Sequence, residues 1–177
     1  MLYICSQIVG FIGFIISLIA YHRDTKEKIF KSMIVANILD IVHYLLLFAY
    51  SGCATKVMAL IRNIVIVIKE KIKFLQSVVI LVIFIILYVL VGIFTYNGLW
   101  SILPVLAAII YMIAVWNGDE MTVKKAAFAC YFLWLAYNIF VFSIAGIASN
   151  TIAIVSTFVA VRRESSLERE KTCNKDF

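Results

Sequence analysis

The chain is poor in charge, glycine and proline. Of its 177 residues, 15% are Asp, Glu, Lys or Arg, 7 are glycine and one is proline, whereas 64% are hydrophobic and the mean hydropathy is +1.04. A water-soluble domain of this length could not bury so much apolar surface. The composition therefore excludes a soluble domain and predicts an all-α integral membrane protein.

Cysteine and histidine are also scarce, and their spacing argues against a metal centre. No CxxC pair occurs, and His22 and His43 have no metal-ligand spacing to the four cysteines, Cys5, Cys53, Cys130 and Cys173. No nucleophile with a base and no phosphate-binding glycine loop can be assembled either. We therefore expect no metal, no cofactor and no enzymatic activity. A disulfide between Cys5 and Cys53 stays open, because both are expected near the outer ends of helices.

The longest uncharged run, Phe74 to Phe94, has 21 residues and is the pivot of the chain. At 1.5 Å per residue, a helix of this length crosses a bilayer core of roughly 30 Å. On either side of it, Ser6 to Ile68 aligns without gaps on Trp100 to Arg162 at an offset of 94 residues, apolar run on apolar run. Each half contains three apolar segments, so one extra crossing between them is needed to make the halves parallel.

We therefore predict seven transmembrane helices, arranged as two parallel three-helix bundles joined by a linker helix. The expected spans are Gln7 to Tyr21, Phe30 to Phe48, Tyr50 to Ile68, Phe74 to Phe94, Leu99 to Trp116, Val123 to Phe142 and Ile144 to Val161. They divide the chain into a first bundle (residues 1–68), a linker region (69–98), a second bundle (99–162) and a polar tail (163–177) that we expect to be mobile.

Basic residues orient these helices. Fourteen of the 16 lysines and arginines fall on one side, in the loops near Lys26, Lys71 and Lys124 and after the last helix. The positive-inside rule then places the N-terminus outside and the C-terminus in the cytoplasm. Because the basic residues are spread over short loops, the net charge of +6 does not indicate a nucleic-acid partner. The expected partner is the lipid bilayer of the cell membrane.

Polar side chains left inside the predicted spans are the candidate functional residues. Asp40 is the one acidic residue near the middle of a span, and it should face the bundle interior, because an ionised carboxylate in lipid costs several kcal/mol unless it is paired or hydrated. Helical spacing places it on one face with Asn37, His43 and Tyr44. At the offset of 94, the matching face carries Tyr131, Trp134, Tyr137 and Asn138. Two such faces at equivalent positions predict the lining of a shared cavity.

Further polar residues lie on the third and seventh spans. Lys56, Arg62 and Asn63 lie on the third, and Asn150 aligns with Lys56 at the offset of 94. Asp40 should be paired with Lys56 or Arg62, although each of these cations could also extend toward a membrane surface. His43 could equally be an interior hydrogen-bonding residue. The candidate binding residues are thus Asn37, Asp40, His43, Lys56, Arg62, Asn63, Tyr131, Trp134, Tyr137, Asn138 and Asn150.

Three segments carry a resemblance to a known family. QIVGFIGFIISLIAYHRDTKEKIFK, HYLLLFAYSGCATKVMALIRNIV and YNIFVFSIAG are similar to the small bacterial inner-membrane family called YgjV, and the similarity extends to about Arg163. The predicted layout also resembles that of the SWEET and PQ-loop transporters. In those proteins a tryptophan on the second helix and an asparagine 16 positions later line the substrate pocket, a spacing that Trp134 and Asn150 share here. Asp40 and Lys56 take the equivalent places in the first half, and the PQ dipeptide is absent.

The resemblance implies a transporter or facilitator of a small polar solute, with a cavity between two helix bundles. The alternative is a non-transporting receptor or scaffold in which Asp40, Lys56 and Arg62 form a fixed polar core. Pro104 is the one proline, and a scarcity of helix-bending prolines argues against a rocking transporter. The sequence leaves the substrate and the existence of a homo-oligomer open.

Overall fold

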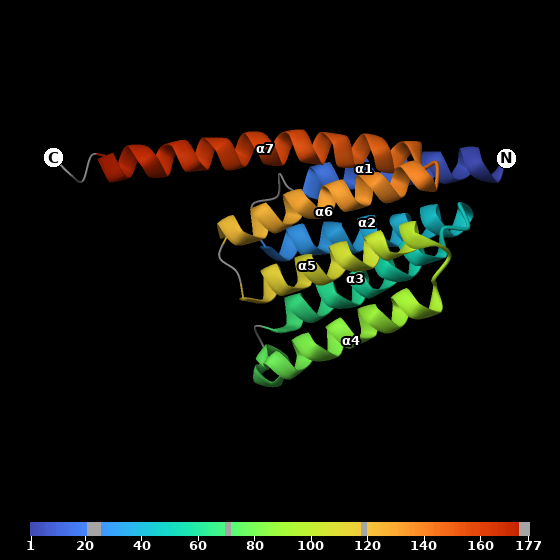
Figure 1. Ribbon diagram of the computed structural model, residues 1–177, viewed down its shortest axis with the longest axis horizontal. Coiled ribbons are helices and arrows are strands. Elements are labelled where there is room, and N and C mark those ends of the chain that lie inside the picture. The colour runs from blue at the N-terminus through green and yellow to red at the C-terminus, as the bar shows by residue number, and fades with distance from the viewer. Residues whose placement is uncertain (21–25, 70–71, 118–119, 174–177) are drawn as a thin grey trace.

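The protein is a bundle of seven α-helices over the described residues (Figure 1). The computed structural model describes residues 1–20, 26–69, 72–117 and 120–173. The helices are α1 (Leu2–Ala20), α2 (Lys26–Leu46), α3 (Tyr50–Lys69), α4 (Val78–Phe94), α5 (Leu103–Asn117), α6 (Glu120–Phe140) and α7 (Ile144–Cys173). The predictions of an all-helical chain and of seven helices are confirmed for these residues.

The helices lie side by side with their axes roughly along one direction (Figure 1). α2 packs between α1 and α3, and α6 packs between α5 and α7. The two groups meet where α1 contacts α7 and where α3 contacts α5. α4 packs against α3 and α5 at one edge of the bundle, the edge opposite α7 in Figure 1.

The predicted start of the pivot helix is wrong for a reason that lies in the local sequence. The pivot helix was expected from Phe74, but Lys73–Gln76 form a 3₁₀ turn and α4 begins at Val78. The Ser77 hydroxyl, the N-cap, accepts a hydrogen bond from the amide of Val79 at 3.2 Å, so this polar residue sets the start. α5 likewise begins after a 3₁₀ turn, Leu99–Ile102.

The polar tail after Arg163 is helical rather than unstructured as far as Cys173. It continues α7, which has 30 residues and extends beyond the rest of the bundle in Figure 1. Glu, Lys and Arg are good helix formers, and Glu164 to Lys171 contains neither glycine nor proline. Over these residues the polar tail is a helical extension of α7.

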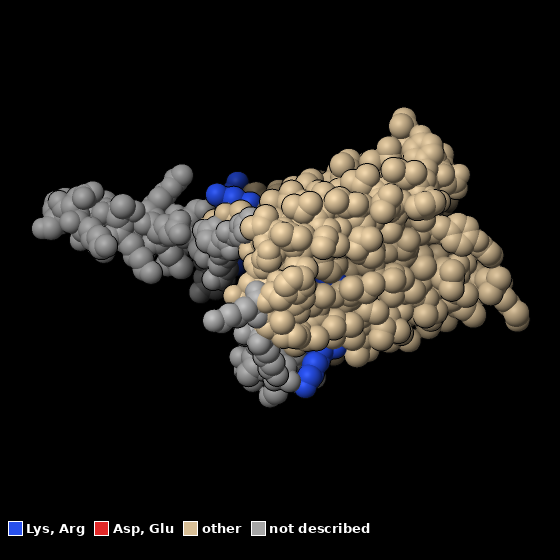
Figure 2. Space-filling model, turned by 90° about the horizontal axis from the view of Figure 1, so that it is seen from below, with Lys and Arg blue, Asp and Glu red and all other residues tan. Residues whose placement is uncertain are grey.

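The outer surface is apolar along most of the bundle. Figure 2 shows a face that is mainly uncharged, with Lys and Arg side chains gathered toward one end. Leu2–Ile19, Tyr50–Lys69 and Leu99–Trp116 are long and apolar enough to cross a membrane, and Val78–Phe94 and Ile144–Val159 are shorter apolar helices. These helices expose large aliphatic side chains, for example Ile15, Ile86 and Val155. Such a surface suits lipid as its solvent.

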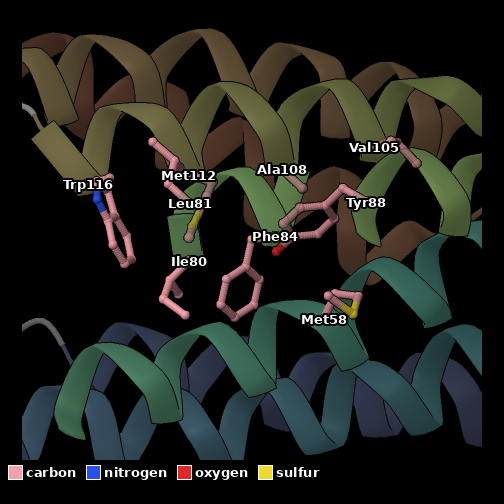
Figure 3. Packing of buried hydrophobic residues seen from close by; sticks show 9 residues of the cluster. All are labelled: Met58, Ile80, Leu81, Phe84, Tyr88, Val105, Ala108, Met112 and Trp116. Carbon is pink, nitrogen blue, oxygen red and sulfur yellow. The ribbon is translucent and has the colours of Figure 1, made fainter. Parts of the chain in front are cut away.

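The largest buried apolar cluster surrounds α4 (Figure 3). Ile80, Leu81, Phe84 and Tyr88 project from α4 between α3 and α5. The residues they meet are Met58 from α3 and Val105, Ala108, Met112 and Trp116 from α5. α4 therefore joins the α1–α3 group to the α5–α7 group by packing as well as by chain connection.

The turn between α2 and α3 and the turn between α6 and α7 have the same hydrogen bonds. Phe48 and Phe142 are the non-glycine residues with positive φ in the described chain, at 57° and 53°, and they lie 94 positions apart. In both turns the next amide, of Ala49 or Ser143, donates to the carbonyl five positions back, with N···O distances of 3.0 and 2.9 Å. This pattern is a Schellman helix ending, which normally has glycine at the positive-φ position. Both turns accept the cost of a phenylalanine there.

Candidate functional site

Asp40 and Lys56 form an ion pair between α2 and α3. The Lys56 ammonium donates to Asp40 Oδ2 at 2.6 Å, and the two side chains are 22% and 23% exposed, respectively. Asp40 lies eight positions before Phe48 and Lys56 eight positions after it, so the antiparallel helices bring them to one level. The predicted pairing of Asp40 with a cation is confirmed, and the partner is Lys56 rather than Arg62.

The same ammonium group also lies over an aromatic ring of the second group of helices. Lys56 Nζ is 4.8 Å from the ring centroid of Trp134 on α6, a cation–π contact. Trp134 packs against Tyr44 and Tyr137, with ring centroids 5.8 and 5.9 Å away. Lys56 therefore lies between Asp40 and Trp134, two residues that the offset of 94 aligns.

Tyr44 and Asn138 are another aligned pair, and they contact each other directly. The Tyr44 hydroxyl donates to Asn138 Oδ1 at 2.9 Å, across a sequence separation of 94. Asn138 in turn donates from Nδ2 to the Trp134 carbonyl at 2.8 Å. Tyr44 is 4% exposed and Asn138 is fully buried. We call Asp40, Tyr44, Lys56, Trp134, Tyr137 and Asn138 the Lys56 cluster.

Tyr137 caps the N-terminus of α3 from the other group of helices. The Gly52 amide lies in the first turn of α3, where backbone donors have no partner within the helix, and it donates to the Tyr137 hydroxyl at 2.9 Å. A Cβ on Gly52 would lie 2.8 Å from the Tyr137 ring and 2.9 Å from its hydroxyl, so only glycine allows this approach. Ala49, the residue before α3, has no side chain that could act as the cap.

The N-terminus of α7 is capped by its own serine. Ser143 precedes α7, and its hydroxyl accepts from the Gly146 amide at 3.0 Å, as an N-cap residue does. A second orphan amide, that of Ala145, donates to Gln7 Oε1 of α1 at 3.0 Å. Gly146 and Ser143 occupy the positions that align with Gly52 and Ala49.

His43 holds this cap from α2. Its Nδ1 is 2.7 Å from the Ser6 carbonyl and its Nε2 is 2.7 Å from the Ser143 hydroxyl. A carbonyl only accepts, so Nδ1 carries the proton and Nε2 accepts from Ser143. His43 is 2% exposed, and both ring nitrogens are used. This is the interior hydrogen-bonding role that the sequence left open for it.

Of the other predicted binding residues, Arg62, Asn63 and Asn150 make their hydrogen bonds outside the Lys56 cluster. The Nε and Nη2 groups of Arg62 both donate to Asn63 Oδ1, at 3.3 and 3.1 Å, in a separate cluster near α4 and α5. Asn150 Nδ2 donates to the Gly146 carbonyl of its own helix at 2.8 Å. Asn37 and Tyr131 are partly buried on α2 and α6. The predicted binding residues of α3 therefore separate, since Lys56 pairs with Asp40 whereas Arg62 bonds to Asn63.

Several residues with side chains at contacts between helices are not among those that the sequence predicts. Ser6, Gln7, Ser143 and Tyr88 were not selected, although Ser143 directly before an apolar run fits an N-cap signal. Tyr88 is the only residue with a polar side chain between Val78 and Phe94. Cys5, Cys53 and Cys130 are free thiols, so the disulfide that the sequence left open is not formed. Within the described residues, no group of three His, Cys, Asp or Glu side chains could hold a metal.

Comparison with known protein families identifies the family to which the chain belongs. The model of a family described as bacterial inner membrane protein, Imp-YgjV, matches residues 4–168. The chain belongs to this family. The match covers all seven helices except the first two residues of α1 and the end of α7, and together with the apolar helices it makes the chain an integral protein of the inner membrane. Searches of curated proteins and of solved structures gave no match.

Proposed function

We propose that this Imp-YgjV family member is a transporter or facilitator of a small polar solute, which binds at Asp40, Lys56 and Trp134. The observation that carries the proposal is the ion pair beneath an aromatic ring: a cation, a carboxylate and a ring face within contact distance of one point. Neighbouring Tyr44 and Tyr137 are 4% and 1% exposed, whereas about a fifth of the Asp40 and Lys56 side chains stays accessible. A polar solute could therefore exchange with the ion pair without unfolding its surroundings.

Part of this proposal is that α1–α3 and α5–α7 are two parallel copies related by a pseudo-two-fold axis, with α4 as linker. In such an arrangement, equivalent residues contact each other only next to the axis. Tyr44 and Asn138 do so, and Lys56 lies between equivalent residues Asp40 and Trp134. The matching turns at Phe48 and Phe142 support the same relation. The binding residues would thus lie at the axis, where transporters built from repeats hold their substrates.

Transport would require the two groups of helices to move relative to each other. The contacts that join them at the end carrying Phe48 and Phe142 include the bond from the Gly52 amide to Tyr137 and the bond between His43 and Ser143. Gly52 and His43 lie nearer than Lys56 and Asp40 to this end of the bundle, so we propose that these bonds close one side. Opening would break these bonds and expose Asp40 and Lys56 to that side.

The second candidate function is a non-transporting receptor or scaffold. The saturated hydrogen bonding of His43 favours it, since both ring nitrogens have partners and the side chain is buried. A fixed polar core of this kind would specify the packing of α1, α2 and α7. A scaffold has no reason to leave part of the Lys56 side chain exposed, as the structure does.

A solute screen separates the two functions. The melting temperature of the detergent-purified protein is measured with neutral sugars, polyols and zwitterionic amino acids, because a ligand that binds only the folded state raises it. A transporter should be stabilised by one class, lose the effect in Trp134→Leu and keep it in Trp100→Phe, a change at an exposed tryptophan on the turn before α5. Uptake of that solute into vesicles then establishes transport. No stabilising solute and no uptake would favour the scaffold.

We also propose that the N-terminus is outside and the C-terminus is in the cytoplasm. The lysines and arginines whose side chains are described and lie near helix ends, such as Lys69 and Lys125, support this orientation through the positive-inside rule. Of the predicted cytoplasmic loop positions, Lys71 lies outside the described residues, and Lys124 lies in the first turns of α6. A cysteine introduced at Lys124 should resist an impermeant thiol reagent in intact cells, whereas one at Asn97 should react. The reverse pattern would invert the topology.

A further inference from the structure

Arg62 is a buried cation whose hydrogen-bonding capacity is largely unused. It is 8% exposed on α3, and its two hydrogen bonds go to the same oxygen, Asn63 Oδ1. A guanidinium has five N–H donors, and two of the five go to this one neutral oxygen. No carboxylate in the described part of the chain pairs with it, because the Asp40 carboxylate pairs with Lys56. An uncompensated charge at membrane depth is costly and indicates a missing partner.

The missing partner must be an anion, because the described groups around Arg62 are all uncharged. The guanidinium carbon lies 4.9 Å above the ring of Tyr111 on α5, which stabilises the cation through its face. Cys130 on α6 is also close to Arg62, but its thiol donates to the Ala107 carbonyl at 3.1 Å. Asn63 already presents its oxygen to Arg62, which leaves its amide hydrogens available as donors.

A second buried group has no hydrogen-bond partner at the same place. Tyr88 on α4 is fully buried, and its hydroxyl makes no hydrogen bond in the described structure. This hydroxyl is close to the Arg62 guanidinium, which can donate to it, so it is the hydroxyl proton that lacks an acceptor in the described structure. Figure 3 shows the Tyr88 side chain within the cluster that α4 forms with α3 and α5. Buried hydroxyls without a partner are rare in proteins, and such a group next to an unpaired cation points to a ligand.

We propose that Arg62 and Tyr88 bind a small monovalent anion, either an inorganic halide or the carboxylate of a small organic acid. The guanidinium supplies charge and N–H donors, and the Tyr88 and Asn63 side chains each supply further donors. A lipid phosphate does not fit, because a headgroup could not reach a side chain that is 8% exposed. The ligand would be enclosed by α3, α4 and α5.

This anion site is separate from the solute site at Lys56. The residue that aligns with Arg62 is Ser156, which is exposed on α7, and α4 occurs once in the chain. The anion site therefore exists only where the linker helix packs against α3. It would neutralise the buried charge between the two groups of helices and so make their packing dependent on the anion.

Anion titration of the purified protein tests the site. Sodium gluconate, whose anion is too bulky for an enclosed site, is replaced stepwise by sodium chloride or sodium acetate at constant ionic strength, and the melting temperature is recorded. Wild-type protein should show a saturable rise, because only a bound ligand saturates. A rise with chloride alone identifies an inorganic anion, and a rise with acetate identifies a carboxylate.

Variants decide whether the rise comes from this site. Arg62→Gln should abolish the saturable rise, whereas Tyr88→Phe should shift the midpoint to about tenfold higher concentration, because one charged hydrogen bond is lost. Arg162→Gln, at an exposed arginine, and the double change Asp40→Asn with Lys56→Met should leave the midpoint unchanged. The proposal is overturned if wild type shows no saturable rise, or if Tyr88→Phe has the wild-type midpoint. The Tyr88→Phe result decides even if Arg62→Gln does not fold.

Discussion

The first turns of α3 and α7 pose the same physical problem and solve it with different side chains. Each has a buried glycine amide, Gly52 or Gly146, that lacks a partner within its helix. At α7 the neighbouring Ser143 is the cap, and His43 orients it. At α3 the equivalent residue is Ala49, and the Tyr137 hydroxyl reaches the amide directly. The phenol thus replaces an imidazole plus a hydroxyl, so the backbone requirement is kept while the chemistry differs.

The same comparison extends to the proposed solute site. Asp40 and Lys56 in the first half align with Trp134 and Asn150 in the second. The Lys56 ammonium contacts the Asp40 carboxylate of the first half and the face of the Trp134 ring of the second half. The proposed solute site is therefore asymmetric, and it would distinguish the two ends of a polar solute.

The largest expected effect comes from removing the charge on one side of this asymmetry. Asp40→Asn leaves the Lys56 ammonium without its carboxylate and should lower the free energy of unfolding by about 3 kcal/mol, the lower end of the range for broken buried pairs. The lower end applies because about a fifth of each side chain is exposed. Adding Lys56→Met removes the unpaired charge and should recover much of the loss. Denaturation of the purified variants measures both.

Lys125→Met is the control, since Lys125 is exposed on α6 and should change stability little. If the double variant is no more stable than Asp40→Asn alone, the loss does not come from the unpaired Lys56.

Tyr137→Phe tests the cap that the second half provides for the first. It deletes the acceptor of the Gly52 amide and should cost about 1–3 kcal/mol, the usual penalty for a buried donor left unsatisfied. Adding Ala49→Ser copies the serine cap of α7 and should restore part of the stability. Thermal melts of the single and double variants check this. A double variant that melts below Tyr137→Phe would show that the two turns are not interchangeable.

The reciprocal exchange sharpens the comparison further. Ser143→Ala leaves Gly146 without its cap and should cost about 1–2 kcal/mol. His43→Tyr in the Ser143→Ala background would copy the first half, with a phenol reaching the amide, and should recover stability relative to Ser143→Ala. The recovery should be smaller than for Ala49→Ser, because Ser6 loses the proton that His43 donates to its carbonyl. Equal stability of the single and double variants would argue against a cap role for this position.

The smallest expected effect lies in the two turns themselves. Phe48→Gly relieves a positive φ of 57° at an exposed side chain and should stabilise the protein by up to about 1 kcal/mol. Phe142→Gly should behave in the same way, since its φ is 53°. Parallel melting curves compare the two. Opposite signs would show that the side chains, rather than the backbone conformation, dominate.

The helices and the pairing of Asp40 with a cation could be predicted from the sequence, but the start of α4 and the individual side-chain partners could not. Apolar runs of span length predicted the helices, and a lone acidic residue in a span predicted the Asp40 ion pair. The late start of α4 was missed, because hydropathy does not register the N-cap at Ser77. Asp40 pairs with Lys56 rather than Arg62 because Asp40 and Lys56 are equally far from the Phe48 turn. The sequence alone does not place that turn well enough to predict this, since helix ends are uncertain by one or two residues. Gln7 acts through a partner on a distant helix, so no local pattern marks it.

We propose that the Lys56 cluster is an accessible solute site rather than a dry core. The fluorescence of Trp134 tests this most directly. In Trp100→Phe with Trp116→Phe, Trp134 is the only tryptophan. A reference protein carries Phe84→Trp instead, in the α4 core, with all three native tryptophans changed to phenylalanine. Acrylamide, a water-soluble quencher, is added to both proteins in lipid vesicles. A steeper quenching slope for Trp134 than for the reference is predicted; equal slopes would contradict the account.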